Sequence, residues 1–321
     1  MKFLFYLPRH LFFVSGFFLW IGFPFTVKLD ALPITPNPKE IKRVLFLGNS
    51  ITYNGKYIKD IETYYRFNHP ERETEFINVG LPSETVSGLS EPGHANGDFP
   101  RPDLHERLER VLELLKPDLV FACYGMNDGI YLPFDQSRFK KFKDGTLRLH
   151  EQVFAAGADI VHLTPPVYDE QNGGSPGYDK VLEKYGDWLL SMGKEEKWKV
   201  VDIHGPMKKF LTEKRRWDPT YTFSADGIHP DATGHWLMAK QILLFLGEEK
   251  MAGAAGINEA LEGKPNVNQV IELVEERQDL TRDSWLSATG HKRPGLRDGL
   301  PLDQALAKGA TMAGQIQNLI K

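Results

Sequence analysis

From residue 42 onward, short apolar runs alternate with longer amphipathic stretches, and this alternation restricts the fold more than any other feature of the sequence. Five runs are rich in apolar or β-branched residues, as buried parallel strands are: 43–47, 76–79, 119–123, 160–163 and 200–203. The intervening and following stretches carry apolar residues at three- and four-residue spacing, which predicts helices at 57–67, 104–115, 139–155, 180–192 and 236–246. Right-handed β–α–β units follow from this order, so we expect a three-layer α/β/α fold around a parallel sheet of about five strands.

The first 35 residues are expected to lie outside the folded domain, as a leader and a linker. Lys2 and Arg9 supply positive charge ahead of an uncharged apolar run at 11–27, and Lys28 and Asp30 end that run. This order is typical of a secretory signal peptide, with an uncleaved membrane anchor and a buried core helix as the alternatives. We therefore expect an exported protein, periplasmic or secreted, and N-terminally anchored if the run is not cleaved.

The rest of the chain divides at Gly247. Residues 36–247 contain the strand–helix alternation and should form the main domain, whereas 248–321 lack strand runs and show helical periodicity only at 267–277 and 302–319. We expect this second part to be a mostly helical extension that wraps the main domain. Its aromatic and cationic residues predict either a polysaccharide contact or an anchor through the tryptophan: Trp285, His291, Lys292, Arg293 and Arg297.

Composition excludes several function classes. The formal net charge is -4, from 39 basic and 43 acidic residues, so a basic face for nucleic acid is not expected. Cys123 is the single cysteine, which rules out an internal disulfide and a cysteine-cluster metal site. Seven histidines are scattered without the spacing of metal ligands, so we expect neither a metal nor another cofactor: 94, 105, 150, 162, 204, 235 and 291.

Two short motifs end the first two strands of the predicted sheet, where a parallel sheet places its ligand site. Ser50 lies in Gly48-Asn49-Ser50 between a strand and a helix, where free helix amides favour developing negative charge. The alternative reading is a glycine turn in which the serine caps the helix. Gly80 ends the second strand, and a glycine there allows a backbone N–H to approach a ligand closely.

Two further motifs supply an amide and an acid–base pair. Asn127, after the third strand, offers a side-chain amide as a donor, although Asn-Asp-Gly is also ordinary turn chemistry. Asp226 precedes His229 by three residues, so the carboxylate can fix the imidazole tautomer, and Pro230 disfavours a helical conformation at the histidine. His204, at the end of the fifth apolar run, is the rival base.

Together the motifs GNSIT, NVG, GMND and DGIHP resemble the four conserved blocks of the SGNH (GDSL-type) hydrolase family, and the resemblance spans residues 43–247. It implies a three-layer hydrolase fold in which Ser50 is the nucleophile, His229 the general base and then acid, and Asp226 the residue that orients the histidine. No metal is required for this chemistry.

The same resemblance implies an oxyanion hole built from the backbone N–H groups of Ser50 and Gly80 and the side-chain amide of Asn127. The sequence departs from the family at Asn49, where an aspartate is more common. An amide has no charge with which to tune the neighbouring serine, but the mechanism does not depend on that carboxylate.

The predicted substrate is an acylated carbohydrate. Two polar loops with aromatic residues, 90–102 and 168–178, follow strands of the predicted sheet, and we expect His94, Arg101 and Tyr124 to contact substrate. A rim of this kind suits sugars better than acyl chains, which would need an apolar groove. We therefore expect removal of O-acetyl or other small acyl groups. A lipase or arylesterase of the same fold is one alternative. A catalytically dead glycan-binding envelope protein is the other, and the intact Ser/His/Asp set argues against it.

Overall fold

The computed structural model describes residues 41–321, and the predicted signal segment lies outside the described residues. Five parallel strands form one sheet in the order β2-β1-β3-β4-β5. Their bounds are β1 Arg43–Gly48, β2 Glu75–Asn78, β3 Leu119–Cys123, β4 Asp159–Leu163 and β5 Lys199–Val201. The predicted fold class, a three-layer α/β/α domain around a five-stranded parallel sheet with a mostly helical C-terminal region, is confirmed.

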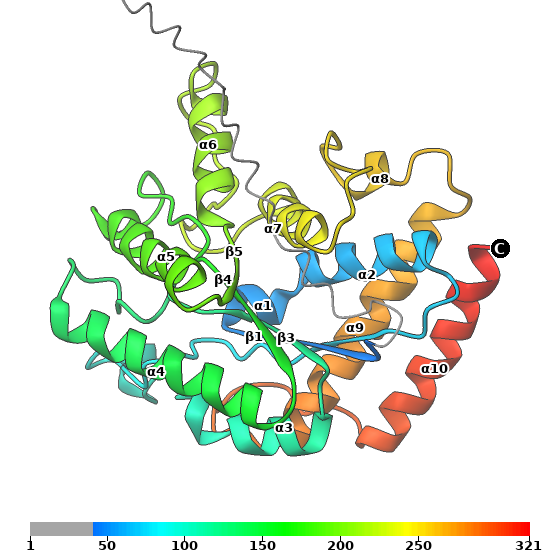
Figure 1. Ribbon diagram of the computed structural model, residues 1–321, viewed down its shortest axis with the longest axis horizontal. Helices are drawn as coiled ribbons and strands as arrows, with labels where there is room; N and C mark the ends of the chain where they lie inside the picture. The colour runs from blue at the N-terminus through cyan, green and yellow to red at the C-terminus, as the bar shows by residue number, and fades with distance from the viewer. Residues whose placement is uncertain (1–40) are drawn as a thin grey trace, which may run out of the picture. The chain divides into compact units, whose positions relative to one another are not determined.

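Helices cover both faces of the sheet (Figure 1). On one face α2 packs against α7, and on the other α4 contacts α3 and stacks Phe142 on Tyr185 of α5. The described chain contains ten α-helices, α1 Ser50–Asn54, α2 Lys56–Asn68, α3 Leu108–Leu115, α4 Gln136–Ala155, α5 Tyr178–Glu195, α6 His204–Arg215, α7 Ala232–Phe245, α8 Ile257–Ala260, α9 Val267–Thr289 and α10 Leu302–Leu319, and two 3₁₀ turns, η1 His94–Gly97 and η2 Leu104–Glu106.

Four helical regions differ from the expectation, the first being the short, unpredicted helix α8. The helix α6 was not predicted, because its amphipathic pattern is weak and only Met207 and Leu211 of its apolar residues are buried. The helix expected at 104–115 is divided into η2 and α3 at Arg107. From hydrophobic periodicity Arg107 is expected to face solvent, but it is fully buried. In the extension, α9 continues twelve residues beyond the expected end at residue 277.

The extension covers one edge of the sheet, at strand β2. Helix α9 contacts α2, α3 and the edge strand β2, and α10 packs on α9 (Figure 1). Gln278 of α9 donates to the carbonyl oxygen of Phe76 at 2.8 Å and to the buried carboxylate of Glu62, which also binds Arg66 and Arg277. Burial alone would raise the pKa of Glu62, but the two arginines lower it below its ordinary value. An edge strand covered in this way cannot pair with another chain.

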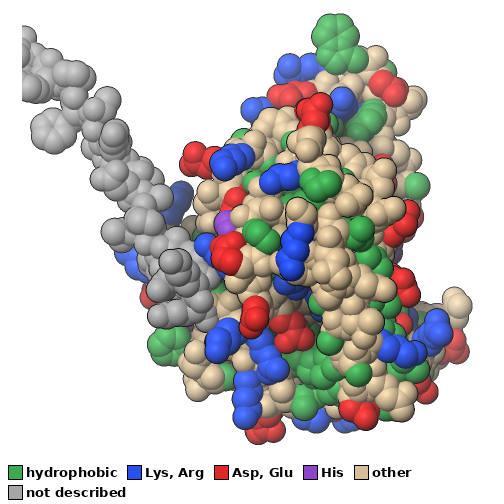
Figure 2. Space-filling view, turned by 90° about the vertical axis from the view of Figure 1, so that its right-hand side faces the viewer, with side chains coloured by type: hydrophobic (Ala, Val, Ile, Leu, Met, Phe, Trp, Pro, Cys, Tyr) green, Lys and Arg blue, Asp and Glu red, His purple; other side chains and the backbone are tan. Residues whose placement is uncertain are grey.

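Charge is mixed on the surface. On the face shown in Figure 2, basic and acidic side chains of the described residues are interspersed, and no continuous basic area of the kind that binds a phosphate backbone is visible there. Among the helices of residues 41–321, none combines the length and the hydropathy needed to cross a bilayer.

Trp285 lies in helix α9, beyond the helical stretch expected at 267–277, and its side chain is only 4% exposed. This burial favours the anchor over the polysaccharide contact. We expect Trp285→Ala to lower the free energy of unfolding by about 3–5 kcal/mol, the usual cost of truncating a buried tryptophan, as measured by chemical denaturation. Turnover of small and polymeric esters should fall together. Trp217→Ala, at a side chain that is 91% exposed, is the control and should leave stability nearly unchanged. A selective loss on polymer at unchanged stability would contradict the anchor.

Candidate active site

Ser50 is the first residue of helix α1, immediately after the end of β1. The residue before it, Asn49, caps this helix: its Oδ1 accepts from the N–H of Ile51 at 3.0 Å, and the side chain is 2% exposed. The turn requires glycine at position 48, because a Cβ there would lie 2.2 Å from Oγ1 of Thr52. The sequence therefore forces a tight strand-to-helix turn that holds the serine at the carboxyl end of the sheet.

His229 and Asp226 meet this serine from the loop before α7. Oγ of Ser50 lies 2.7 Å from Nε2 of His229, and Nδ1 of His229 lies 2.6 Å from Oδ2 of Asp226. Because a carboxylate only accepts hydrogen bonds, Nδ1 carries the proton and Nε2 is the acceptor that faces the hydroxyl. The three predicted residues are therefore brought into one hydrogen-bonded series, with the geometry needed to remove a proton from the serine.

Asp226 is held in its ionised form. Partial burial alone would raise the pKa of Asp226, but hydrogen bonds from the His229 ring and from the backbone N–H groups of His229 and Ile228 lower it to about 2. The carboxylate therefore keeps its negative charge at any pH near neutrality. A fixed negative charge beside Nδ1 can stabilise an imidazolium ring.

The acid–base loop is supported by the loop at 168–178, which we had expected to form a substrate rim. Gly227 has a φ of 78°, and a Cβ there would lie 2.5 Å from the N of Gly173. The N–H of Asp169 donates to the Gly227 carbonyl at 2.8 Å, and its buried carboxylate pairs with Arg215 at 2.7 Å. Sequence reasoning missed Asp169, because its partner lies on the unpredicted helix α6.

The side-chain amide of Asn127 is only partly hydrogen-bonded among the described residues. Its Nδ2 donates to the carbonyl oxygen of Glu84 at 3.1 Å, and its Oδ1 accepts from the hydroxyl of Tyr131 at 2.9 Å. Nδ2 carries two hydrogens, so one donor remains after the bond to Glu84. The side chain is 3% exposed, and its orientation is fixed by both partners.

The structure corrects the expectation for Gly80. Its one N–H donates to Oδ1 of Asn78 at 2.9 Å, so this donor is already satisfied within the protein. What the glycine provides is close packing, since a Cβ there would lie 2.4 Å from the N of Tyr53. The next turn is closed by a hydrogen bond from the N–H of Glu84 to the carbonyl of Leu81. Within this turn, Ser83 has a φ of 69°. The N–H of Ser83 takes part in no hydrogen bond among the described residues.

Tyr124 is corrected as well. Its side chain is 5% exposed and its hydroxyl donates to the buried carboxylate of Glu84 at 2.6 Å, so it is a structural residue and not a surface for substrate. His204, the rival base, is buried at the start of α6, where its Nδ1 bonds to the carbonyl of Pro165 at 3.1 Å. The imidazole that contacts Ser50 is therefore that of His229.

His94 and Arg101 both lie in the loop at 90–102. Arg101 forms a bidentate ion pair with Glu91, with both bonds at 2.6 Å, and its guanidinium stacks 5.4 Å from the ring centre of Tyr131. The ring of His94 packs edge-on against Phe99, with ring centres 5.4 Å apart. Their contact with substrate stays a prediction, and the charge of Arg101 is already balanced by Glu91.

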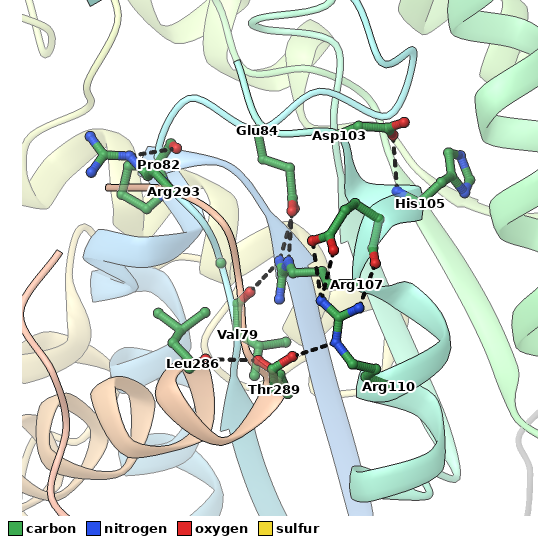
Figure 3. A network of polar contacts seen from close by, with 12 residues as sticks. Val79, Pro82, Glu84, Asp103, His105, Arg107, Arg110, Leu286, Thr289 and Arg293 are labelled. Atoms are coloured by element: carbon green, nitrogen blue, oxygen red, sulfur yellow. Dashed lines mark hydrogen bonds and ion pairs between the residues drawn. The ribbon is translucent and has the colours of Figure 1, made fainter. Parts of the chain in front are cut away.

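Sequence reasoning missed a buried ion pair between Arg107 and Glu84 (Figure 3). Arg107 is 1% exposed; its Nε and Nη2 bind the two carboxylate oxygens of Glu84 at 2.7 and 2.8 Å, and Nη2 also binds the Val79 carbonyl at 2.8 Å. Burial raises the pKa of Glu84, and the positive charge of Arg107 partly offsets this rise. The pair fixes the segment 79–84, and the Glu84 carbonyl in turn holds the amide of Asn127.

Within the described part of the chain, no three His, Cys, Asp or Glu side chains are grouped as metal ligands would be. The model of the GDSL-like lipase/acylhydrolase family matches residues 46–237. An acetylxylan esterase of Geobacillus stearothermophilus is 23% identical over 228 residues, which cover 65% of this chain and 95% of that protein.

Solved structures share the fold. The crystal structure of an acetylxylan esterase from Geobacillus stearothermophilus matches with a TM-score of 0.51 at 21% identity, over 64% of this chain and 94% of that one. A gut microbial diltiazem-metabolizing enzyme matches with a TM-score of 0.55 at 24% identity, over 65% of this chain; the match spans only 47% of that longer chain.

Proposed function

The chain belongs to the GDSL-like lipase/acylhydrolase family and is a carboxylic ester hydrolase, and on that premise we propose that it removes O-acetyl or other small acyl groups from carbohydrate through an acyl-enzyme on Ser50. The observation that carries the proposed mechanism is the hydrogen-bonded series from Oγ of Ser50 through His229 to Asp226, at 2.7 and 2.6 Å. The predicted signal segment adds a proposed location outside the cytoplasm, where acylated polysaccharides are found.

In this mechanism His229 acts first as base and then as acid. Nε2 takes the proton from Ser50 as Oγ attacks the ester carbonyl, and the resulting imidazolium is stabilised by the Asp226 carboxylate. The tetrahedral intermediate collapses when the bond from the acyl carbon to the sugar oxygen breaks and His229 gives that proton to this oxygen, which leaves as a hydroxyl group. Water then attacks the acyl group on Ser50 with His229 again as base, and the acid and the free serine are released.

The negative oxygen of the tetrahedral intermediate needs hydrogen-bond donors. We assign this role to the remaining N–H of the Asn127 amide, to the N–H of Ser50, and to the N–H of Ser83 in place of that of Gly80, whose N–H bonds to Asn78. Such donors act mainly on the transition state, where the charge develops.

Removing one donor tests this assignment. We expect Asn127→Ala to lower kcat by roughly 10²–10³-fold with little change in KM, because the lost bond forms mainly in the transition state. Asn258→Ala, at an exposed position of α8, is the control and should keep wild-type kinetics. If KM rises and kcat is retained, Asn127 is a substrate contact and its proposed role is wrong.

The carbohydrate part of the proposal is supported by the acetylxylan esterase that matches over nearly its whole length. The test is acetate release from a panel of acetylated polysaccharides, beside p-nitrophenyl acetate and p-nitrophenyl octanoate. The proposal expects acetate release from polysaccharide and poor turnover of the octanoate. Preference for octanoate would favour the lipase alternative, and binding of glycan with no turnover of any ester would favour the dead glycan-binding protein.

A further inference from the structure

The C-terminal extension delivers an arginine to the turn beside the proposed active site. Nε of Arg293 donates to the carbonyl oxygen of Pro82 at 3.0 Å (Figure 3). The residue before that proline, Leu81, donates its N–H to the carbonyl of Gly48 at 2.8 Å. The turn that Arg293 contacts therefore lies against the strand end that presents Ser50, although the arginine lies more than two hundred residues away in sequence.

One further contact places the guanidinium against a loop that we predicted to face substrate. Its Cζ lies 5.1 Å from the ring centre of Phe99, in the loop at 90–102. Tyr53, three residues after Ser50 in α1, partly offsets the lowering of the Arg293 pKa by burial. The extension and the main domain thus meet at this arginine, next to the serine-bearing helix.

No carboxylate among residues 41–321 pairs with Arg293. Arg101, Arg107 and Arg282 each bind a carboxylate, whereas Arg293 forms no ion pair within residues 41–321. Its Nη1 binds the Pro294 carbonyl at 2.8 Å, and Nη2 takes part in no hydrogen bond among the described residues. Partial burial lowers the pKa of Arg293 below its ordinary value.

We propose that Arg293 is a specificity-determining residue that binds a carboxylate group of the substrate near the scissile ester. A guanidinium is suited to this ligand because its planar N–H groups match a carboxylate. The guanidinium of Arg293 is also partly desolvated and has no counterion in the described part of the chain. The inference rests on the proposed function and narrows it to acylated carbohydrates that contain uronate sugars. A carboxylate on the acyl group itself has the same chemistry, so the test separates the two sources.

The experiment compares Arg293→Gln with wild type on acetylated polygalacturonate, acetylated neutral mannan, p-nitrophenyl acetate and p-nitrophenyl hemisuccinate. The quantity compared is the ratio of kcat/KM for the uronate polymer to kcat/KM for the neutral polymer. This ratio should be about 10- to 100-fold lower in Arg293→Gln than in wild type, as expected for a lost charged hydrogen bond. Added salt should reduce the wild-type ratio. Arg293→Lys should restore part of it. Arg148→Gln is the control, since Arg148 is exposed on α4 and also lacks an ion pair within residues 41–321, and it should leave the ratio unchanged.

A wild-type ratio near one together with no preference for hemisuccinate over acetate would overturn the proposal. An equal fall on all four substrates in Arg293→Gln would also overturn it, and would assign Arg293 to support of the turn at Pro82. A preference for hemisuccinate over acetate that is lost in Arg293→Gln would support the carboxylate site and assign the carboxylate to the acyl group. If wild type hydrolyses p-nitrophenyl acetate but releases acetate from neither polysaccharide, the carbohydrate function fails, while the hemisuccinate comparison still decides whether Arg293 binds a carboxylate.

Discussion

Replacing Ser50 with alanine should lower esterase turnover by roughly 10⁴- to 10⁶-fold, as expected when a nucleophile is removed. The expectation rests on the short contact between Oγ of Ser50 and Nε2 of His229, because no other hydroxyl is hydrogen-bonded to that imidazole among the described residues. The hydroxyl is partly exposed and makes no other hydrogen bond within the described residues, so its removal should leave the fold intact. The measurement is kcat on p-nitrophenyl acetate, with circular dichroism to verify folding.

Ser137→Ala is the matched control for this prediction, because Ser137 is an exposed serine on α4, away from the acid–base loop. It should retain wild-type turnover. Near-normal hydrolysis by Ser50→Ala, in a preparation shown to be free of contaminating esterase, would contradict the proposed mechanism as a whole.

Replacing His229 with alanine should abolish turnover nearly as completely, since the serine then has no base and the leaving group no acid. The comparison that gives this result its meaning is His204→Ala. His204 is buried, and its Nδ1 binds the Pro165 carbonyl at 3.1 Å, so its loss should reduce stability but leave kcat per folded molecule close to wild type. The measurement is kcat for both variants, scaled to the folded fraction from denaturant curves.

If His204→Ala eliminates turnover at full folding and His229→Ala does not, the general base is His204 and the hydrogen-bonded series in the structure is not the catalytic one. Loss of activity in both variants at full folding would require two essential imidazoles and would also contradict the account.

The fold could be predicted from periodicity because four of the five strands, β1 to β4, are short runs buried at all or nearly all positions. The run 119–123, for example, is buried at every position. What periodicity could not predict is structure held by buried polar groups. Arg107 lies where the expected helix is divided, and its buried guanidinium binds Glu84. Helix α6 has few apolar residues and contributes Arg215 to a pair with Asp169.

The site residues that the structure brings together were predicted from motifs at strand ends. Which of their donors are already hydrogen-bonded within the protein was not predicted. The sequence cannot show that Oδ1 of Asn78 accepts a hydrogen bond from the N–H of Gly80, because that bond depends on the turn which follows. It also cannot show that the extension returns to the site, since the contact between Arg293 and Pro82 depends on how α9 packs on α2 and β2.

The central claim, that Ser50 is the nucleophile activated by His229, is tested most directly by covalent labelling with a fluorophosphonate. After digestion, mass spectrometry of the wild-type enzyme should find one adduct, on Ser50, formed in step with the loss of activity. Labelling of His229→Ala should be slower by orders of magnitude, because the hydroxyl is then not activated. An adduct on any other residue, or complete inactivation with Ser50 unmodified, would contradict the account.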